Sequence, residues 1–559
     1  KENTLSFTEE SFDDFYAGKG STYPDLHGSI GILFEQASSR GHLQESINGD
    51  LDFYTTIKNQ VRASLSTLEG SLAHKSELMD YQWQFTKDAY RLAADQDHQG
   101  YLLTESQDKS RFNMLLELLQ QHNIRIYSLA QDMTIGKTRY AAKDSVYIPL
   151  AQPQSRLIAS IFSTQTSFND NTFYDVSSWN LAMAYNIAFS KVDEGRKVHT
   201  QDSLWQAETR TALELPSTPD YSYAIDWTDY QAPRLIYALL QEGIRIRTAM
   251  IPFTAQSRGE TRAFPAGTML VNAGIQEQDW WPKFTKIADQ SQVRISPIAT
   301  GMTPSGSDLG SRNMEPVELP NVLIVGGQGT NLYEVGETWY LLDRHVGFSP
   351  TIIDKNRLGR VDLNKYTHIL LTDGWYSKSD EALAKSLKSW TQQGGILWGQ
   401  KRAALWLAEQ ELLKADTISQ SDMAKRYETK DLAYDQMEVL SGKQRIAGAF
   451  FEAKLDLSHP MAFGFGKTQI PLFKNNTALL LEPTQPFSRV AQYSEFPLLA
   501  GYADKKNVEK IAGATGVLAH SLGRGAVIGV TDNPNFRAIM HGTSRFLFNA
   551  LFVAQGLEN

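Results

Sequence analysis

Two stretches of this chain follow the same order of apolar and polar segments. The stretch from Tyr101 and the stretch from Tyr223 each begin with an apolar strand, continue into a helix, and return to a strand with the pattern Ile-Arg-Ile. A second strand and a helix then follow in both. A repeat of this size indicates that each stretch is one supersecondary unit. We therefore expect one α/β unit over 96–215 and a related unit over 216–320 that ends in a linker at 301–320, a stretch rich in Gly, Ser, Pro and Met.

A third region, 321–559, continues the alternation of strands and helices. The apolar runs Val322–Val325, Tyr366–Asp373 and Gly394–Gly399 predict strands, and Ser379–Gln393 predicts a helix between two of them. Alternation of this kind builds parallel sheets with helices on both faces, so we expect an α/β fold whose last domain is doubly wound. The glycine-rich turn after Val325 lacks the third glycine of a dinucleotide fingerprint and the lysine of a P-loop, which favours a tight strand-to-helix turn.

Composition excludes several classes of function. The chain has 559 residues, which is enough for three or four domains, and a net charge of −9 without a block of like charge. A nucleic-acid partner held by phosphate contacts is therefore not expected. No apolar run reaches the roughly 18–20 residues of a membrane span. The chain has no cysteine, which rules out disulfides, thiolate metal sites and cysteine nucleophiles.

Near the N-terminus, a loop rich in Gly and Ser leads into the apolar run Ile30–Phe34, which ends at Glu35. Apolar residues occupy both alternating faces of this run, so we expect a strand buried on both sides. A carboxylate at the carboxyl end of such a strand is placed where open α/β sheets bind ligands. From 48 to 95, apolar residues recur every three or four positions and predict a helical connector.

The segment Phe15-Tyr-Ala-Gly-Lys-Gly-Ser-Thr-Tyr-Pro, followed by the strand that ends at Glu35, resembles the last part of the catalytic domain of zinc metallocarboxypeptidases. The resemblance implies that 1–47 is a fragment of that domain and that the whole protein removes C-terminal residues from a peptide substrate. It assigns Glu35 the proton transfer and Tyr16, with Tyr23 as its rival, a hydrogen bond to the substrate. Ser21, Thr22 and Tyr23 would shape the pocket for the terminal side chain.

The same resemblance implies a zinc cofactor bound through His-x-x-Glu and a later His, all N-terminal to the glutamate. Two such patterns occur here, at His42 and at His74, but both follow Glu35. We therefore expect no metal ligand in this chain, zinc bound by residues outside it, and no activity of the chain alone. A periplasmic or secreted location is implied by the resemblance as well.

The C-terminal domain, through Tyr366-Thr-His-Ile-Leu-Leu-Thr-Asp-Gly and Gly394-Gly-Ile-Leu-Trp-Gly, resembles the class I glutamine amidotransferase fold. Those enzymes attack with a cysteine on a strained turn, so a chain without cysteine implies a non-catalytic relative. The whole arrangement is similar to large bacterial carboxypeptidase-like proteins that carry such a domain. Two alternatives remain. One is a peptide- or carbohydrate-binding module in which Glu35 is structural, and the other is a scaffold that self-associates through the C-terminal domain.

Overall fold

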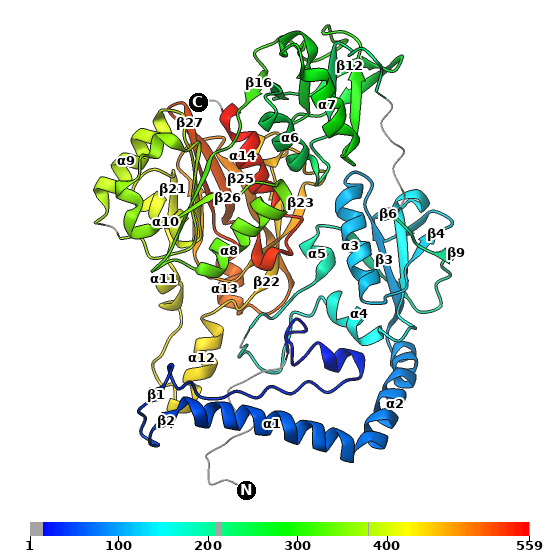
Figure 1. Ribbon diagram of the computed structural model, residues 1–559, viewed down its shortest axis with the longest axis vertical. Coiled ribbons are helices and arrows are strands. Elements are labelled where there is room, and N and C mark those ends of the chain that lie inside the picture. Colours follow the sequence, from blue (N-terminus) through cyan, green and yellow to red (C-terminus); the bar gives the residue numbers. More distant parts are fainter. Residues whose placement is uncertain (1–14, 174, 208–214, 378, 558–559) are drawn as a thin grey trace.

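The computed structural model of this chain describes residues 15–173, 175–207, 215–377 and 379–557. It confirms an α/β fold made of three sheet-containing regions, with a pair of long helices at the N-terminal end (Figure 1). No helix formed by these residues combines the length and hydrophobicity that a bilayer crossing needs.

Unit one is a five-stranded sheet with the order β8-β3-β7-β4-β9. The helix α3 (Lys109–Gln121) connects β3 to β4, and the hairpin β5–β6 precedes β7. Two short helices, α4 (Ser155–Ile161) and α5 (Leu181–Ala184), follow. The strands are β3 (His98–Thr104), β4 (Tyr127–Leu129), β5 (Met133–Ile135), β6 (Thr138–Tyr140), β7 (Ser145–Pro149), β8 (Ala188–Asp193) and β9 (Thr200–Leu204).

Unit two has the equivalent strand order, β15-β10-β14-β11-β16. Its helix α6 (Ala232–Gln241) takes the place of α3, and the hairpin β12–β13 takes the place of β5–β6. The helix α7 (Trp280–Asp289) precedes β15. The strands are β10 (Ser222–Ile225), β11 (Ile246–Ala249), β12 (Phe253–Ser257), β13 (Glu260–Phe264), β14 (Met269–Asn272), β15 (Ile295–Ile298) and β16 (Met314–Val317).

The expectation of parallel sheets is wrong for both units. β3 pairs antiparallel with β7, and β7 pairs antiparallel with β4. The two strands that α3 connects do run in the same direction, as a helical crossover requires, but β7 lies between them. β14 separates β10 from β11 in the same way. The linker expected over 301–320 is also partly structured, because β16 forms the edge of the second sheet against β11.

The C-terminal domain confirms the doubly wound prediction. Its parallel strands lie in the order β18-β17-β19-β20-β27, and β26, β25, β22 and β23 extend the sheet antiparallel. β21 and β24 pair beside this path. The strands are β17 (Val322–Gly326), β18 (Thr351–Asp354), β19 (His368–Leu371), β20 (Ile396–Gln400), β21 (Ala415–Ile418), β22 (Ala449–Leu455), β23 (Gln469–Lys474), β24 (Leu479–Pro483), β25 (Arg489–Ala500), β26 (Thr515–Leu522) and β27 (Gly525–Val530).

Alternating residues of the parallel strands face two different cores. Leu323 and Val325 of β17 pack in the same core as α9 (Glu381–Gln392) and α10 (Arg402–Glu409). Val322 and Ile324 pack in the core that contains α8 (Leu332–Tyr340) and α14 (Arg545–Phe552). Burial on both faces explains why these strands read as continuous apolar runs. The remaining helices are α11 (Gln420–Ala424), α12 (Met437–Lys443) and α13 (Lys505–Ile511).

Unit two and the C-terminal domain share one core. Side chains of β10, α6 and α7 belong to the same apolar cluster as those of α14. Two fully buried residues of α14 also bond across this contact. Asn549 accepts from the Trp227 indole N–H at 2.7 Å, and Arg545 donates to the Thr228 carbonyl at 2.7 Å.

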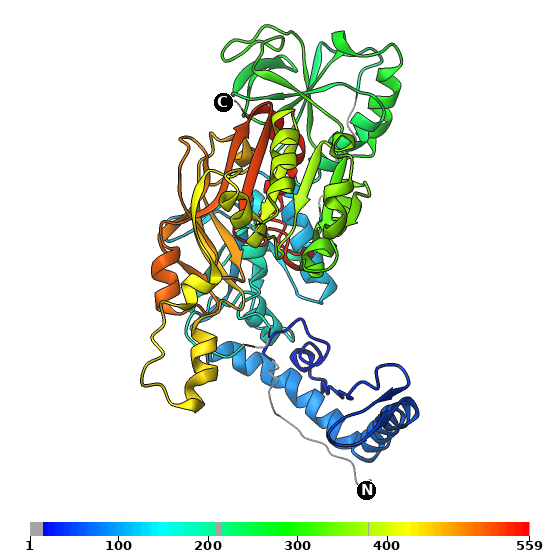
Figure 2. The ribbon, with the colours of Figure 1, turned by 90° about the vertical axis from the view of Figure 1, so that its left-hand side faces the viewer.

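The N-terminal region has two long helices, α1 (Phe53–Ala73) and α2 (Lys75–Ala94), after the short strands β1 (Leu43–Gln44) and β2 (Leu51–Asp52). α1 contains no buried residue, although Ile57, Val61 and Leu65 lie on one face of it. Figures 1 and 2 show the segment before β1 running beside this helix at the edge of the molecule.

The strand expected at Ile30–Phe34 does not form in this structure. The segment is not part of any sheet, and Ile30, Ile32, Leu33 and Phe34 are 50–59% exposed. A strand exists only when a neighbouring strand satisfies its backbone N–H and C=O groups, and no described strand pairs with this run; the Gly31 N–H instead donates to the Asp25 carboxylate at 2.7 Å. Glu35 is therefore an exposed residue on an extended segment, not a carboxylate at the end of a buried strand.

Candidate functional site

Polar residues follow the carboxyl ends of the parallel strands in the C-terminal domain. Asp373 follows β19, Lys401 follows β20 and Asp532 follows β27, while the loop after β17 leads to Glu334 on α8. This edge is where doubly wound sheets bind ligands. We call these residues and their polar neighbours the carboxyl-edge cluster. Its members are Glu334, Glu337, Asp373, Gln400, Lys401, Arg402, Lys474, Tyr493, Asp532 and Asn533.

Lys401 occupies a strained strand-to-helix turn. Its backbone has φ 51° and ψ −115°, a conformation that costs a non-glycine residue of the order of 1–3 kcal/mol. Its backbone N–H donates to the Val530 carbonyl at 2.7 Å, which anchors the turn to β27. Its ammonium is ion-paired with Glu334, whose other oxygen accepts from the Gln400 side chain at 2.7 Å. Both charged side chains are buried, so the pair is shielded from water.

Each of the two carboxylates beside the turn at Lys401, Glu334 and Asp373, has a cationic partner. Burial raises the pKa of Glu334, and the Lys401 ammonium opposes that rise. Asp373 holds Arg402 through two parallel bonds of 2.7 and 2.9 Å, the bidentate geometry that makes arginine–carboxylate pairs strong. The turn is therefore held by two neighbouring ion pairs, one at Lys401 and one at Arg402.

A second buried pair joins the parallel and antiparallel halves of the sheet. The Lys474 ammonium lies 3.2 Å from Asp532, and the Tyr493 hydroxyl donates to the other Asp532 oxygen at 2.5 Å. Burial lowers the pKa of Lys474 and raises that of Asp532, while their mutual attraction opposes both shifts. The two charges stabilise each other only as long as both are present.

Glu337 connects the cluster to the N-terminal segment. It accepts from Asn533 at 2.8 Å and from the backbone N–H of Arg537 at 2.7 Å, and burial raises its pKa to about 7. The Arg537 guanidinium pairs with Asp175 and lies 4.7 Å from the centre of the Tyr16 ring. The predicted substrate-binding tyrosine is thus packed against the C-terminal domain.

The other predicted pocket residues lie in one compact turn. Ser21, Thr22 and Tyr23 immediately precede the short 3₁₀ helix η1 (Pro24–His27). The Tyr23 hydroxyl is 2.6 Å from the His122 ring at the end of α3, and burial raises the Tyr23 pKa. Gly31 lies against this turn, since a Cβ there would come within 1.6 Å of the Ser21 carbonyl oxygen. Glu35 lies farther along the extended segment.

The two His-x-x-Glu patterns form no metal site in the described residues. His74 lies 2.7 Å from Glu77, but both side chains are largely exposed on α2 and no third ligand joins them. No group of three or more potential ligands is present anywhere in the described ranges. These residues therefore do not fit a zinc ion, and the expectation that zinc is bound elsewhere stays a prediction.

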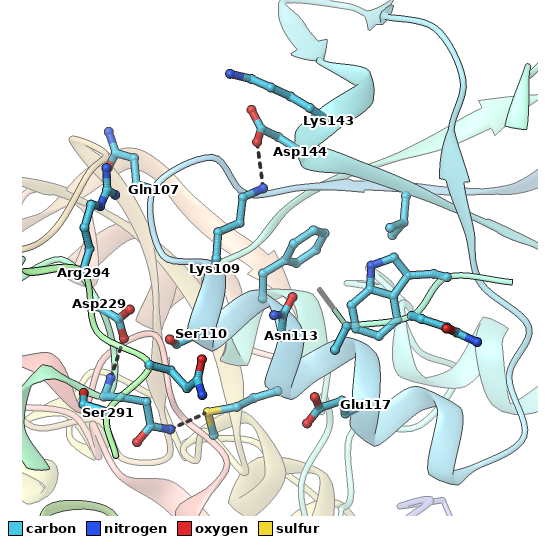
Figure 3. A pocket seen from close by; sticks show the side chains of 18 of the residues that line it. Gln107, Lys109, Ser110, Asn113, Glu117, Lys143, Asp144, Asp229, Ser291 and Arg294 are labelled. Atoms are coloured by element: carbon cyan, nitrogen blue, oxygen red, sulfur yellow. Dashed lines mark hydrogen bonds and ion pairs between the residues drawn. The ribbon is translucent and has the colours of Figure 1, made fainter. Parts of the chain in front are cut away.

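A cleft of about 1130 Å³ separates unit one from unit two (Figure 3). One wall is α3, and the other is formed by α6 and the residues after α7. The sequence repeat predicted the two units but not the cleft between them. The carboxyl-edge cluster was not predicted either, although Lys401 and Asp532 each follow an apolar run, which is the pattern that places polar residues at this edge.

Comparisons with known proteins give no family. No protein-family model and no curated protein matches the sequence. Solved structures similar to it include a ThuA-like protein from Bacteroides uniformis, at 14% identity and a TM-score of 0.25, covering 44% of this chain and 93% of that one. A glutamine amidotransferase from Thermotoga maritima is 11% identical with a TM-score of 0.24, covering 42% and 94%.

An exo-beta-1,4-mannosidase from Opitutaceae bacterium strain TAV5 is 14% identical with a TM-score of 0.24, covering 41% of this chain and 35% of the mannosidase. Likenesses this weak carry no functional argument. The assignment of this chain as α/β, with a doubly wound C-terminal domain, rests on its own strand order.

Proposed function

We propose that this chain is part of a zinc metallocarboxypeptidase-like hydrolase, in which residues 1–47 are a fragment of a peptidase domain, closed by the helices that follow, and the zinc ligands lie outside the chain. The observation that supports this most directly is the unfilled apolar surface of that region. The extended run Ile30–Phe34 pairs with no described strand and has exposed apolar side chains, and α1 beside it has no buried residue.

A single additional sheet, outside the described residues, could cover both of these features. An amphipathic helix of 21 residues normally buries its apolar stripe against a sheet or another helix. Ile57, Val61, Leu65, Leu68 and Leu72 of α1 are instead 46–76% exposed. A sheet that paired with Ile30–Phe34 would cover both the extended run and this stripe, and it would place Glu35 at a strand end.

The proposal gives two residues of this chain a chemical role. Glu35 would accept a proton from the attacking water and pass it to the leaving amine of the peptide. The Tyr16 hydroxyl would donate a hydrogen bond to the substrate. No step through a metal is derived, because the described residues supply no metal site.

The test is the Glu35→Gln variant of the full-length protein, assayed for release of C-terminal residues from peptides in the presence of zinc. We expect turnover to fall about 10²- to 10⁴-fold, the contribution of a positioned proton-transfer group. Glu69→Gln, which alters another exposed carboxylate, on α1, is the matched control and should leave turnover unchanged. Full turnover by Glu35→Gln, or zinc-dependent cleavage by this chain alone, would refute the proposal.

The C-terminal domain has a non-catalytic role in this proposal, as its likeness to the amidotransferase fold without cysteine suggests. In support, the strained turn carries Lys401, whose ammonium is already ion-paired with Glu334. Self-association through this domain and a periplasmic or secreted location belong to the same proposal. Sedimentation of the full chain tests the first, and a monomer at all concentrations would contradict it.

A further inference from the structure

The cleft between the two α/β units has the size and position of a ligand site. Its volume of about 1130 Å³ lies slightly above the usual range for small-molecule sites, which is roughly 300–1,000 Å³, so it has room for a ligand of several units. The equivalent helices of the repeat, α3 and α6, contribute to opposite walls. Binding sites commonly lie at such junctions between two folded units.

Two of the four cationic side chains that line the cleft are neutralised by carboxylates, and a third, Arg234, donates to the backbone carbonyls of Arg344 and His345. Lys109 lies 2.7 Å from Asp144, and Arg294 lies 2.9 Å from Asp226. Figure 3 shows the Lys109–Asp144 pair on the unit-one wall. A phosphate or another anion would have to compete with these carboxylates, and this argues against an anionic ligand.

Much of the remaining lining is uncharged and polar. The side-chain amides of Asn113, Gln290 and Gln292 have no hydrogen-bond partner among the described residues, and Ser110 lies beside Asn113 on α3. Amide groups offer both donors and acceptors, which suits a ligand that carries many hydroxyl groups. Glu117 and Asp229 add acceptors on the two walls.

An aromatic side chain completes the lining. Trp205 is held through its backbone, which donates to Ile126 at 2.8 Å and accepts from Gln120 at 2.8 Å. Its half-buried ring lines the cleft, and its indole N–H has no partner within the described ranges. A fixed indole combines an apolar face with one hydrogen-bond donor. The apolar C–H face of a sugar ring can stack on such a surface while its hydroxyls bond to neighbouring amides.

From these features we infer that the cleft is a binding site for a neutral oligosaccharide. A peptide is the less suitable occupant, because extended peptides are usually held through a free strand edge and the described strands that line this cleft offer none. Ser128 lines it from β4, but β4 is paired on both sides. The inference does not depend on the peptidase proposal, since it uses no residue near Glu35.

The experiment is calorimetric titration of the full chain with cellotetraose, maltotetraose and chitotetraose, and with tetraalanine and inorganic phosphate for comparison. We expect at least one tetrasaccharide to bind and neither comparison ligand to do so. Trp205→Ala should weaken binding at least about tenfold, a loss equivalent to about 1.4 kcal/mol. Trp205→Phe keeps a stacking face but lacks the N–H, so it should lose less.

Two further variants keep the test decisive. Asn113→Ala removes a half-buried amide without a protein partner, so it should weaken binding without affecting folding. Trp83→Ala removes an exposed tryptophan of α2 and should leave binding unchanged. The inference is overturned if no tetrasaccharide binds, if tetraalanine binds in the cleft instead, or if neither the Trp205 nor the Asn113 substitutions alter affinity. Glu35→Gln should bind the sugar normally, which separates this result from the peptidase assay.

Discussion

The buried ion pair between Lys474 and Asp532 allows a direct test of how much a compensated buried charge matters to the stability of this protein. Replacing Lys474 by methionine keeps the volume of the side chain but removes the charge. Asp532 would then remain buried with the Tyr493 hydroxyl as a partner and without its cation. Breaking one side of a buried pair costs about 3–5 kcal/mol, since the remaining charge is left uncompensated. At about 2–4 °C per kcal/mol for a domain of this size, the melting temperature should fall by roughly 6–20 °C.

Thermal unfolding followed by circular dichroism measures this loss, and a double variant tests its cause. Lys474→Met combined with Asp532→Asn removes both charges, so it should be more stable than Lys474→Met alone. Lys505→Met is the control, because Lys505 and Glu509 form an exposed pair at 3.8 Å that contributes at most about 1 kcal/mol. If the double variant is no more stable than Lys474→Met, the loss comes from packing and the electrostatic reasoning is wrong.

Three further predictions concern stability. Leu65→Ala on the exposed face of α1 should change the free energy of unfolding by less than about 0.5 kcal/mol, whereas Leu116→Ala in the core of unit one should lower it by about 2–5 kcal/mol. Urea denaturation measures both values. Equal effects would show that another part of the protein covers α1. Glu337 has a raised pKa of about 7, so the folded state retains its proton longer than the unfolded chain does, and stability should fall as pH rises from about 4.5 to 7. Melting curves of Glu337→Gln across this range should show a shallower fall, and an unchanged slope would exclude Glu337 as the cause. Gly327→Ala should lower the melting temperature, because φ is 81° there and a Cβ would come within 2.3 Å of Asp354; an unaltered melting temperature would mean that the turn can rearrange.

Local sequence patterns predicted the strands β17, β19 and β20 and the helix α9 of the C-terminal domain. The parallel strands are buried on both faces, so each appears as an uninterrupted apolar run such as Val322–Val325. The repeat likewise predicted that both units contain the same elements. Neither pattern could show that β7 lies between β3 and β4, because strand order depends on pairing between distant residues.

The candidate site was less predictable, for the same physical reason. The ion pair between Glu334 and Lys401 joins residues that are distant in sequence, and only the fold brings them together. The prediction of a strand at Ile30–Phe34 failed although its local pattern was clear. Its composition is that of a buried strand, but composition cannot supply the neighbouring strand that it needs.

The position of α14 has a consequence for how this protein would respond to proteolysis. This helix, near the C-terminal end of the described residues, bonds to Thr228 and Trp227, which lie on the other side of the stretch 301–320. A cut in that stretch would therefore break the chain without releasing either part, because β16 and α14 still hold both parts together. We expect such a nicked protein to elute as one particle and to melt in a single transition.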